Sequence, residues 1–304
     1  MSFGVTILGS SSALPTSERF PTAHLLKANE RFFLIDCGEG TQMQLRKYRI
    51  RLGKINHIFI SHLHGDHTFG LFGLLSTMNL LGRKEPLHIY GPGLLEEMLL
   101  DHLKFFQSDY DYDIAFHRIQ SRRSALVYED KNIEVRSLPL IHRIPTCGFL
   151  FREKEKERNM IKEKIIEYKI PVREIAKIKK GSDFILPDGS VISNADLTMN
   201  PPVPRSYAYC SDTRPNQAIL PLIKNVDLLY HESTFLHADE KLAHETYHTT
   251  SRQAAEFARQ ANAGKLLIGH FSSRYKDSSG FELEARETFE NTIAVNDGDV
   301  FEVD

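Results

Sequence analysis

Short apolar runs, each followed by polar residues, recur along the whole chain. They are rich in aliphatic and aromatic side chains and cover residues 55–60, 133–141, 207–211, 226–230 and 265–269. Runs of this length and composition predict buried β-strands. Helical signals lie between them: an apolar stretch begins at Thr68, and Thr249-Thr250-Ser251 offers capping hydroxyls to a helix over 252–258. The alternation of strands and helices predicts an α/β fold.

The segment that follows the first of these strands is crowded with metal-ligating side chains. Within six residues it contains His62, His64, Asp66 and His67, and Gly65 would allow a sharp turn between them. If the strand geometry continues, His62 and His64 project to the same side, while the two residues beyond the turn aim at a neighbouring point. A surface turn rich in histidine is the alternative. The spacing favours two adjacent metal ions.

The other strands end in further candidate ligands. These are His142, Asp212, His231 with Glu232, and His270. A single histidine after a strand is more often a hydrogen-bonded structural residue than a ligand, so each candidate is weak alone. Strand ends that converge on one edge of a sheet would, however, bring them together.

Combined with the first motif, these residues complete two ligand sets. One set is His62, His64 and His142; the other is Asp66, His67 and His270. Asp212 has two carboxylate oxygens and could bridge both metals. His231 is left over, and we interpret it as structural or as a support for a ligand.

Composition is that of a soluble globular enzyme. The 304 residues are 41% hydrophobic and 26% charged, and no apolar run is long enough to span a bilayer. The start of the chain lacks the features of a signal peptide. Three scattered cysteines, Cys37, Cys147 and Cys210, do not form a disulfide framework and favour a reducing cytoplasm. We interpret Cys210 as a packing residue despite its proximity to Asp212.

One segment departs from the overall charge balance. Residues 152–181 contain eleven Lys and Arg against six Glu, a net charge of +5 in a chain of net charge −2. Such an excess is typical of a surface that binds a phosphate backbone. A solvated helix over residues 163–167 explains the charge equally well, so charge alone leaves both readings open.

The chain resembles a known family. The His-x-His-x-Asp-His signature is similar to that of the metallo-β-lactamase superfamily, and further segments resemble the ribonuclease Z family more closely. These segments are Asp36–Gln42, Ser211–Pro215, His231–Thr234, His248–Thr250 and, as the most family-specific, His270–Tyr275.

The resemblance implies a four-layer αβ/βα sandwich formed by residues 1–304 as one domain. It also implies an inserted basic arm over residues 152–195 that grips tRNA, in which Lys179 and Lys180 match the family. The stretch 170–175 lacks the Gly-Pro found in bacterial members, which leaves the geometry of the arm tip open.

The resemblance further implies an endoribonuclease that removes the 3′ trailer of precursor tRNA and leaves a 3′-hydroxyl on the tRNA. Two zinc ions would act at the site, although the same donors accept manganese or iron. By this analogy Asp66 orients the attacking water and takes its proton. His248 is a candidate donor to the leaving oxygen or to the phosphate, with Glu232 as a candidate to orient its ring. Arg274 would clamp a phosphate oxygen. A cytoplasmic homodimer is expected from the same analogy.

Three alternative functions are weighed against this one. A sibling metallo-hydrolase could act on small phosphodiesters or sulfate esters, but such substrates need no basic arm. A β-lactamase-type enzyme would have no use for the arm either. A non-enzymatic nucleic-acid binder on this fold would be expected to have lost ligands, and none is missing from the sequence.

Overall fold

The structure of the chain is a computed structural model that describes residues 2–106 and 109–303. Contacts divide the chain into two compact units. The larger unit consists of Met1–Arg152 together with Arg205–Asp304, and the smaller is Glu153–Pro204. The sequence predicts an inserted arm over residues 152–195, whereas the smaller unit ends at Pro204 because the stretch after residue 195 still pairs within it.

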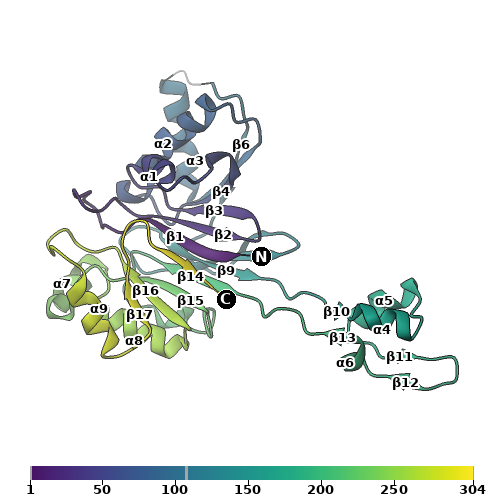
Figure 1. Ribbon diagram of the computed structural model, residues 1–304. Helices are drawn as coiled ribbons and strands as arrows, with labels where there is room; N and C mark the ends of the chain where they lie inside the picture. The colour runs from purple at the N-terminus through teal and green to yellow at the C-terminus, as the bar shows by residue number, and fades with distance from the viewer. Residues whose placement is uncertain (1, 107–108, 304) are drawn as a thin grey trace. The chain divides into compact units, whose positions relative to one another are not determined.

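Two seven-stranded mixed sheets form the centre of the larger unit, within its described residues (Figure 1). The first has the order β18(Val300–Glu302), β1(Phe3–Gly9), β2(Ala23–Ala28), β3(Arg31–Ile35), β4(Ile55–Phe59), β5(Leu87–Gly91), β6(Ile114–Arg118). The second has the order β17(Thr292–Ala294), β16(Lys265–Gly269), β15(Leu228–Glu232), β14(Ser206–Cys210), β9(Cys147–Glu153), β8(Ile133–Pro139), β7(Leu126–Glu129).

Helices cover the outer face of each sheet. The first sheet carries α1(Thr41–Lys47), α2(Gly65–Leu80) and α3(Gly93–Phe105), and the second carries α7(Glu240–Thr246), α8(Ser251–Ala261) and α9(Ser279–Arg286) (Figure 1). One hydrophobic cluster lies between the two sheets, and two more lie beneath the helices. The predicted four-layer αβ/βα sandwich is therefore confirmed.

The predicted caps of the last long helix are present as a capping box. The Thr250 hydroxyl accepts from the backbone N–H of Gln253, and the Gln253 side chain accepts from the backbone of Thr250. Cys210 is fully buried in the cluster beneath α8 and α9, as expected of a packing residue. No helix in the described part of the chain is long and apolar enough to cross a membrane.

The smaller unit has its own sheets, helices and core. It contains β10(Asn159–Met160) paired with β13(Thr198–Met199), β11(Phe184–Ile185) paired with β12(Val191–Ile192), and the helices α4(Lys162–Glu167), α5(Val172–Lys179) and α6(Asn194–Leu197). Ile170, Ile178 and Leu197 form its buried cluster. Across Glu153–Pro204 there are ten Lys and Arg against nine Asp and Glu. The basic excess predicted for residues 152–181 is thus offset by acidic residues later in the unit.

The predicted turn at Gly65 is corrected by the structure. Gly65 is the first residue of α2, and its φ is not among the positive values that require glycine. Instead, a Cβ at this position would stand 2.4 Å from Cε2 of Phe69. Glycine leaves room for the Phe69 ring, which lies over the first turn of the helix, as expected for a side chain four residues later.

Candidate metal centre

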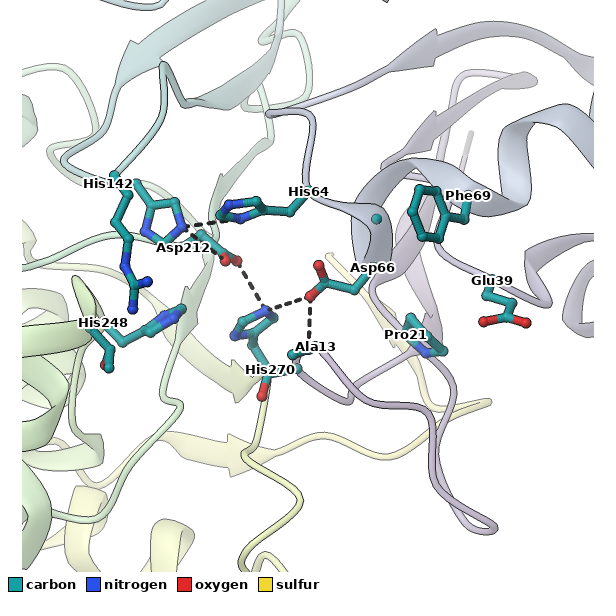
Figure 2. Close-up of a pocket in the computed structure, with 14 residues that line it drawn as sticks. Ala13, Pro21, Glu39, His64, Asp66, Phe69, His142, Asp212, His248 and His270 are labelled. Carbon is teal, nitrogen blue, oxygen red and sulfur yellow. Dashed lines mark hydrogen bonds and ion pairs between the residues drawn. The ribbon is translucent and has the colours of Figure 1, made fainter. Parts of the chain in front are cut away.

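The strand ends converge on a cavity of about 460 Å³, shown in Figure 2. His64 lies between β4 and α2, His142 follows β8, Asp212 follows β14, and His270 follows β16 directly. All four line the cavity, together with Asp66 and His248. His62 and His67 are fully buried behind them. The edge expected from the strand pattern therefore carries the predicted ligands.

Donor atoms of these residues form two compact groups. His62, His64, His142 and Asp212 make up one, and Asp66, His67 and His270 the other; within each group the ligand atoms lie within 4.8 Å of one another. All seven residues proposed as ligands from the sequence are brought together. Asp212, His248 and His270 form a further overlapping group of this kind.

Asp212 lies between the two groups. Its Oδ1 is 3.1 Å from Nε2 of His67 and 3.0 Å from Nε2 of His270. Its Oδ2 is 3.6 Å from Nε2 of His62 and 3.7 Å from Nε2 of His142. Each carboxylate oxygen thus faces a different group of imidazoles, which is the arrangement a bridging ligand requires.

Each buried ligand histidine is held at one ring nitrogen by the protein. These contacts join Nδ1 of His62 to Ser61 Oγ (2.9 Å), Nδ1 of His67 to Asp36 Oδ2 (2.8 Å), Nδ1 of His142 to the Tyr247 carbonyl (3.2 Å) and Nδ1 of His270 to Thr234 Oγ1 (2.9 Å). In every case Nε2 is left to face the centre. Metal-binding histidines in proteins are oriented in this way.

The chemistry of the donors fits divalent metal ions. Nε2 of His67 and Nε2 of His270 are buried without a hydrogen-bond partner. Burial alone would lower the pKa of His67, but the carboxylates of Asp212, Asp36 and Asp66 outweigh it and hold that pKa well above its usual value. Burial likewise opposes ionisation of Asp212, yet the surrounding histidines keep its pKa well below the usual range. This excess of buried carboxylate charge calls for cations at the centre.

Asp36 supports the centre from behind. Its carboxylate accepts from the backbone N–H of Ser61 (2.7 Å), the Ser61 hydroxyl (2.8 Å), the Tyr209 hydroxyl (2.6 Å) and His67. These contacts tie β3, the turn after β4 and β14 to one carboxylate. A side chain bonded in this way fixes the ring of His67 and its tautomer.

Three site residues have left-handed backbone conformations. The φ angles are 56° for Asp36, 53° for Asp212 and 61° for His270. Residues other than glycine adopt this region at some cost, and such strain gathers at functional sites. The strain at these strand ends is consistent with side chains held in place for binding.

His248 and Glu232 form a pair at the edge of the cavity. Nδ1 of His248 is 2.9 Å from Oε1 of the fully buried Glu232, which also accepts from the backbone of Thr213 and Thr234. Burial disfavours the charged imidazole, but Glu232 and the nearby site carboxylates outweigh it and raise the pKa of His248 to about 9. His231 points to the opposite face of β15, against Phe257 at 5.0 Å between ring centroids.

The three residues predicted to contact the substrate do not line this cavity. The Arg274 guanidinium stacks over Phe235 at 5.2 Å and is not among the residues that line the cavity. Lys179 pairs with Glu157 at 3.4 Å, and both Lys179 and Lys180 belong to the smaller unit.

The sequence reasoning assigned no role to seven residues that line the cavity: Ser12, Ala13, Pro21, Glu39, Phe69, Arg143 and Thr246. Arg143 and Phe69 each lie within two residues of a predicted ligand in the sequence, and this proximity was the available signal. Ala13 acts through its backbone N–H, which donates to Oδ2 of Asp66 at 2.8 Å, so its side-chain type gave no signal.

Comparison with known proteins gives consistent matches. Ribonuclease Z of Bacteroides fragilis (strain ATCC 25285) is 50% identical over 291 residues, covering 96% of this chain and 96% of that protein. The crystal structure of human tRNase Z, short form, superposes with a TM-score of 0.71 at 26% identity, covering 98% of each chain.

Two further matches concern the fold and the first half of the chain. The metallo-β-lactamase fold protein YhfI from Bacillus subtilis has a TM-score of 0.69 at 19% identity over 99% of each chain, which bears on the fold alone. A family model described as Anti-Pycsar protein Apyc1 matches residues 3–154, half of the chain. That range includes the first five ligands, of which His142 is the last, but ends before Asp212 and His270.

Proposed function

We propose that the chain, which belongs to the ribonuclease Z family, is a tRNA 3′-processing endoribonuclease. Its first half also belongs to the family described as Anti-Pycsar protein Apyc1. The observation that carries this proposal is the complete set of seven ligand donors in a chain that matches its ribonuclease Z relatives over nearly its full length. The relatives span all seven ligands, whereas the shorter match contains only the first five.

We propose that the two ligand groups hold two divalent metal ions, with zinc as the expected metal. Imidazole and carboxylate donors suit zinc and also accept manganese or iron. Such ions would supply positive charge at the scissile phosphate and lower the pKa of an attacking water. Asp212 would serve both ions, since each of its oxygens faces one group.

Asp66 is proposed as the proton acceptor of the reaction. Its contacts with Ala13, His67 and His270 all use Oδ2, so Oδ1 is available to the cavity. Burial alone would raise the pKa of Asp66, but His67 and His270 outweigh it and the net shift is downward, which keeps the carboxylate ionised. An ionised carboxylate at this place can orient a water and take its proton.

His248 is proposed as the proton donor to the leaving group. Nδ1 donates to Glu232, and the raised pKa of His248 keeps its ring protonated, so Nε2 carries a second proton that faces the cavity. In the hydrolysis, the water oxygen bonds to phosphorus as its proton passes to Asp66, and the bond from phosphorus to O3′ breaks. O3′ takes the proton from His248, so the tRNA ends in a 3′-hydroxyl and the trailer in a 5′-phosphate.

Glu232→Gln is expected to move the alkaline limb of the kcat profile to lower pH. The Glu232 carboxylate stabilises the imidazolium of His248, so wild-type activity should persist above neutral pH and fall as the pH rises through the raised pKa. Without the carboxylate charge the pKa of His248 drops, so kcat begins to fall at a lower pH. Profiles of kcat against pH test this, with His248→Asn as a variant that should lack the limb. An unmoved limb in Glu232→Gln would rule out the assigned pair.

A comparison of substrates tests the proposed function against its alternative. The wild-type protein should have a far higher kcat/KM for a precursor tRNA than for bis(p-nitrophenyl) phosphate or a sulfate ester. The sibling metallo-hydrolase reading requires the reverse order. Both substrate classes would use the same metal ligands, so the order of their kcat/KM values distinguishes the two functions.

We further propose that Glu153–Pro204 is an arm that contacts tRNA, inserted into a single catalytic domain. Its cations Lys156, Lys162, Lys169 and Lys180 have no acidic partner among the described residues. Cations without a partner are available to phosphates. The net charge of the unit contributes little to tRNA binding, because its acidic residues nearly balance its basic ones.

A homodimer and a cytoplasmic location complete the proposal. Exposed apolar side chains gather on α2 and α3 and at their ends, namely Leu80, Leu81, Leu94, Leu100, Phe105 and Phe106. The ring of Phe72 on α2 contacts His102 on α3 at 4.3 Å, so the two helices lie side by side. A second copy of the chain would cover this face. Light scattering should give twice the chain mass of 34.8 kDa, and a monomer would contradict the dimer.

The three free, buried cysteines suit a reducing compartment.

A further inference from the structure

The cavity has two chemically different ends. Figure 2 shows Phe69, Pro21 and Glu39 on one side, His142 and His248 on the other, and Asp66 with His270 between them. The second side holds the ligand histidines. The first side offers an aromatic ring, a proline and a carboxylate. A nucleotide has the same division, since its phosphate is charged and its base is flat and neutral.

Phe69 is unusual as an exposed aromatic side chain in a polar cavity. Its exposed fraction is 63%, and no other ring lies against it in the part of the chain that the structure describes. Exposure of a ring that could be buried elsewhere is unfavourable. The exposed face therefore suits a partner that stacks on it.

The ring lies close to the turn that carries the metal ligands. It lies over the backbone of Gly65, where a Cβ would come within 2.4 Å of Cε2 and 2.5 Å of Cζ. The glycine lets the ring rest on the turn that carries the metal ligands His64 and Asp66. A ring seated there lines the same cavity as the residues proposed to act on the phosphate.

Glu39 disfavours phosphate at this end of the cavity. Its side chain is exposed, lines the cavity and has no hydrogen bond or ion pair among the described residues. An unpaired carboxylate repels a phosphate but accepts hydrogen bonds from the N–H groups of a base. Arg143, by contrast, offers the cavity a guanidinium that suits phosphate oxygens.

We propose that Phe69, with Pro21 on the same side of the cavity, stacks the nucleobase next to the cleaved bond and so places the scissile phosphate at the metal ligands. This inference rests on the proposed function. It makes Phe69 a substrate-binding residue for single-stranded RNA at the cleavage site, where unstacked bases are accessible to aromatic side chains.

The test measures kcat/KM for Phe69→Ala on three precursor tRNAs. One is intact, one lacks the base of the last nucleotide before the cleaved bond, and one lacks the base of the first nucleotide after it. On intact precursor the variant should lose roughly 5- to 150-fold, as expected for one base stacked on an aromatic ring. On one of the two abasic precursors the same substitution should cost about twofold or less, because the stacking partner is already gone.

Two further variants separate stacking from folding. Phe69→Tyr retains a flat ring and should keep near wild-type kcat/KM, while Phe69→Leu retains apolar bulk without the ring and should behave like Phe69→Ala. A penalty for Phe69→Ala that is equal on all three precursors, or absent on the intact one, would overturn the stacking. Failure of the wild-type protein to cleave intact precursor would instead overturn the proposed function on which it rests.

Discussion

Asp212→Ala is expected to abolish cleavage of precursor tRNA and to empty the metal centre. The side chain is 3% exposed, and its two oxygens face the imidazoles of both ligand groups. Its removal would delete the one ligand that we propose to be common to both ions, and it would leave the imidazoles around it without a shared carboxylate. We expect kcat/KM to fall by roughly 10³-fold or more, as for the loss of a preorganised electrostatic group at a reacting phosphate. Metal content, measured by atomic emission, should fall with it.

Two matched variants control this result. Asp212→Asn keeps the shape but loses the charge and should also lose metal and activity. Asp130→Ala removes a carboxylate of the same length that pairs with Arg31 away from the cavity, and it should leave activity per folded molecule within about a factor of two. Full metal content and near-normal cleavage in Asp212→Ala would refute the bridging role.

Deletion of the arm is expected to separate tRNA cleavage from the underlying chemistry. Arg152 and Ser206 are register partners in the antiparallel pair β9–β14, so a short turn can join them once residues 153–204 are removed. The three hydrophobic clusters of the larger unit contain none of the described residues of this segment. The shortened protein should fold and turn over bis(p-nitrophenyl) phosphate normally, yet lose roughly 100-fold in kcat/KM on precursor tRNA.

Charge substitutions within the arm sharpen this prediction. Neutralising Lys169 and Lys180, which lack acidic partners among the described residues, should raise the KM for precursor tRNA and reduce its salt dependence. Neutralising Lys164 and Lys177, which pair with Glu167 and Glu174, should have a smaller effect. Unchanged tRNA cleavage after deletion would contradict the assigned role of the arm.

The α/β class and the ligand positions were predictable from sequence because both depend on local patterns, whereas the four layers were expected only from the family resemblance. An apolar strand followed by His or Asp places that residue at a sheet edge, and this rule located His142, Asp212 and His270. The same rule was less informative inside a strand: His231 and Glu232 are both in β15, where alternation alone sends one to the cavity and the other to Phe257.

Other features depend on contacts between distant segments and gave no such pattern. The backbone N–H of Ala13 reaches Asp66 from a loop 53 positions earlier. Gly65 looked like a turn residue, but its role is to accommodate the Phe69 ring. Arg274 matched the family as a phosphate contact, and nothing in the sequence indicated that its guanidinium lies over Phe235. The charge of the arm was overestimated because its limits could not be read from the basic run alone.

Mapping the ends of the products is the most direct test of the central claim. Wild-type protein is incubated with a precursor tRNA that carries a 3′ trailer, and both fragments are sequenced and tested for terminal phosphate. The account predicts a single cut at the 3′ end of the tRNA, with a 3′-hydroxyl on the tRNA and a 5′-phosphate on the trailer, lost after chelation and restored by zinc. Cleavage that survives chelation, or a tRNA that ends in a 3′-phosphate, would contradict it.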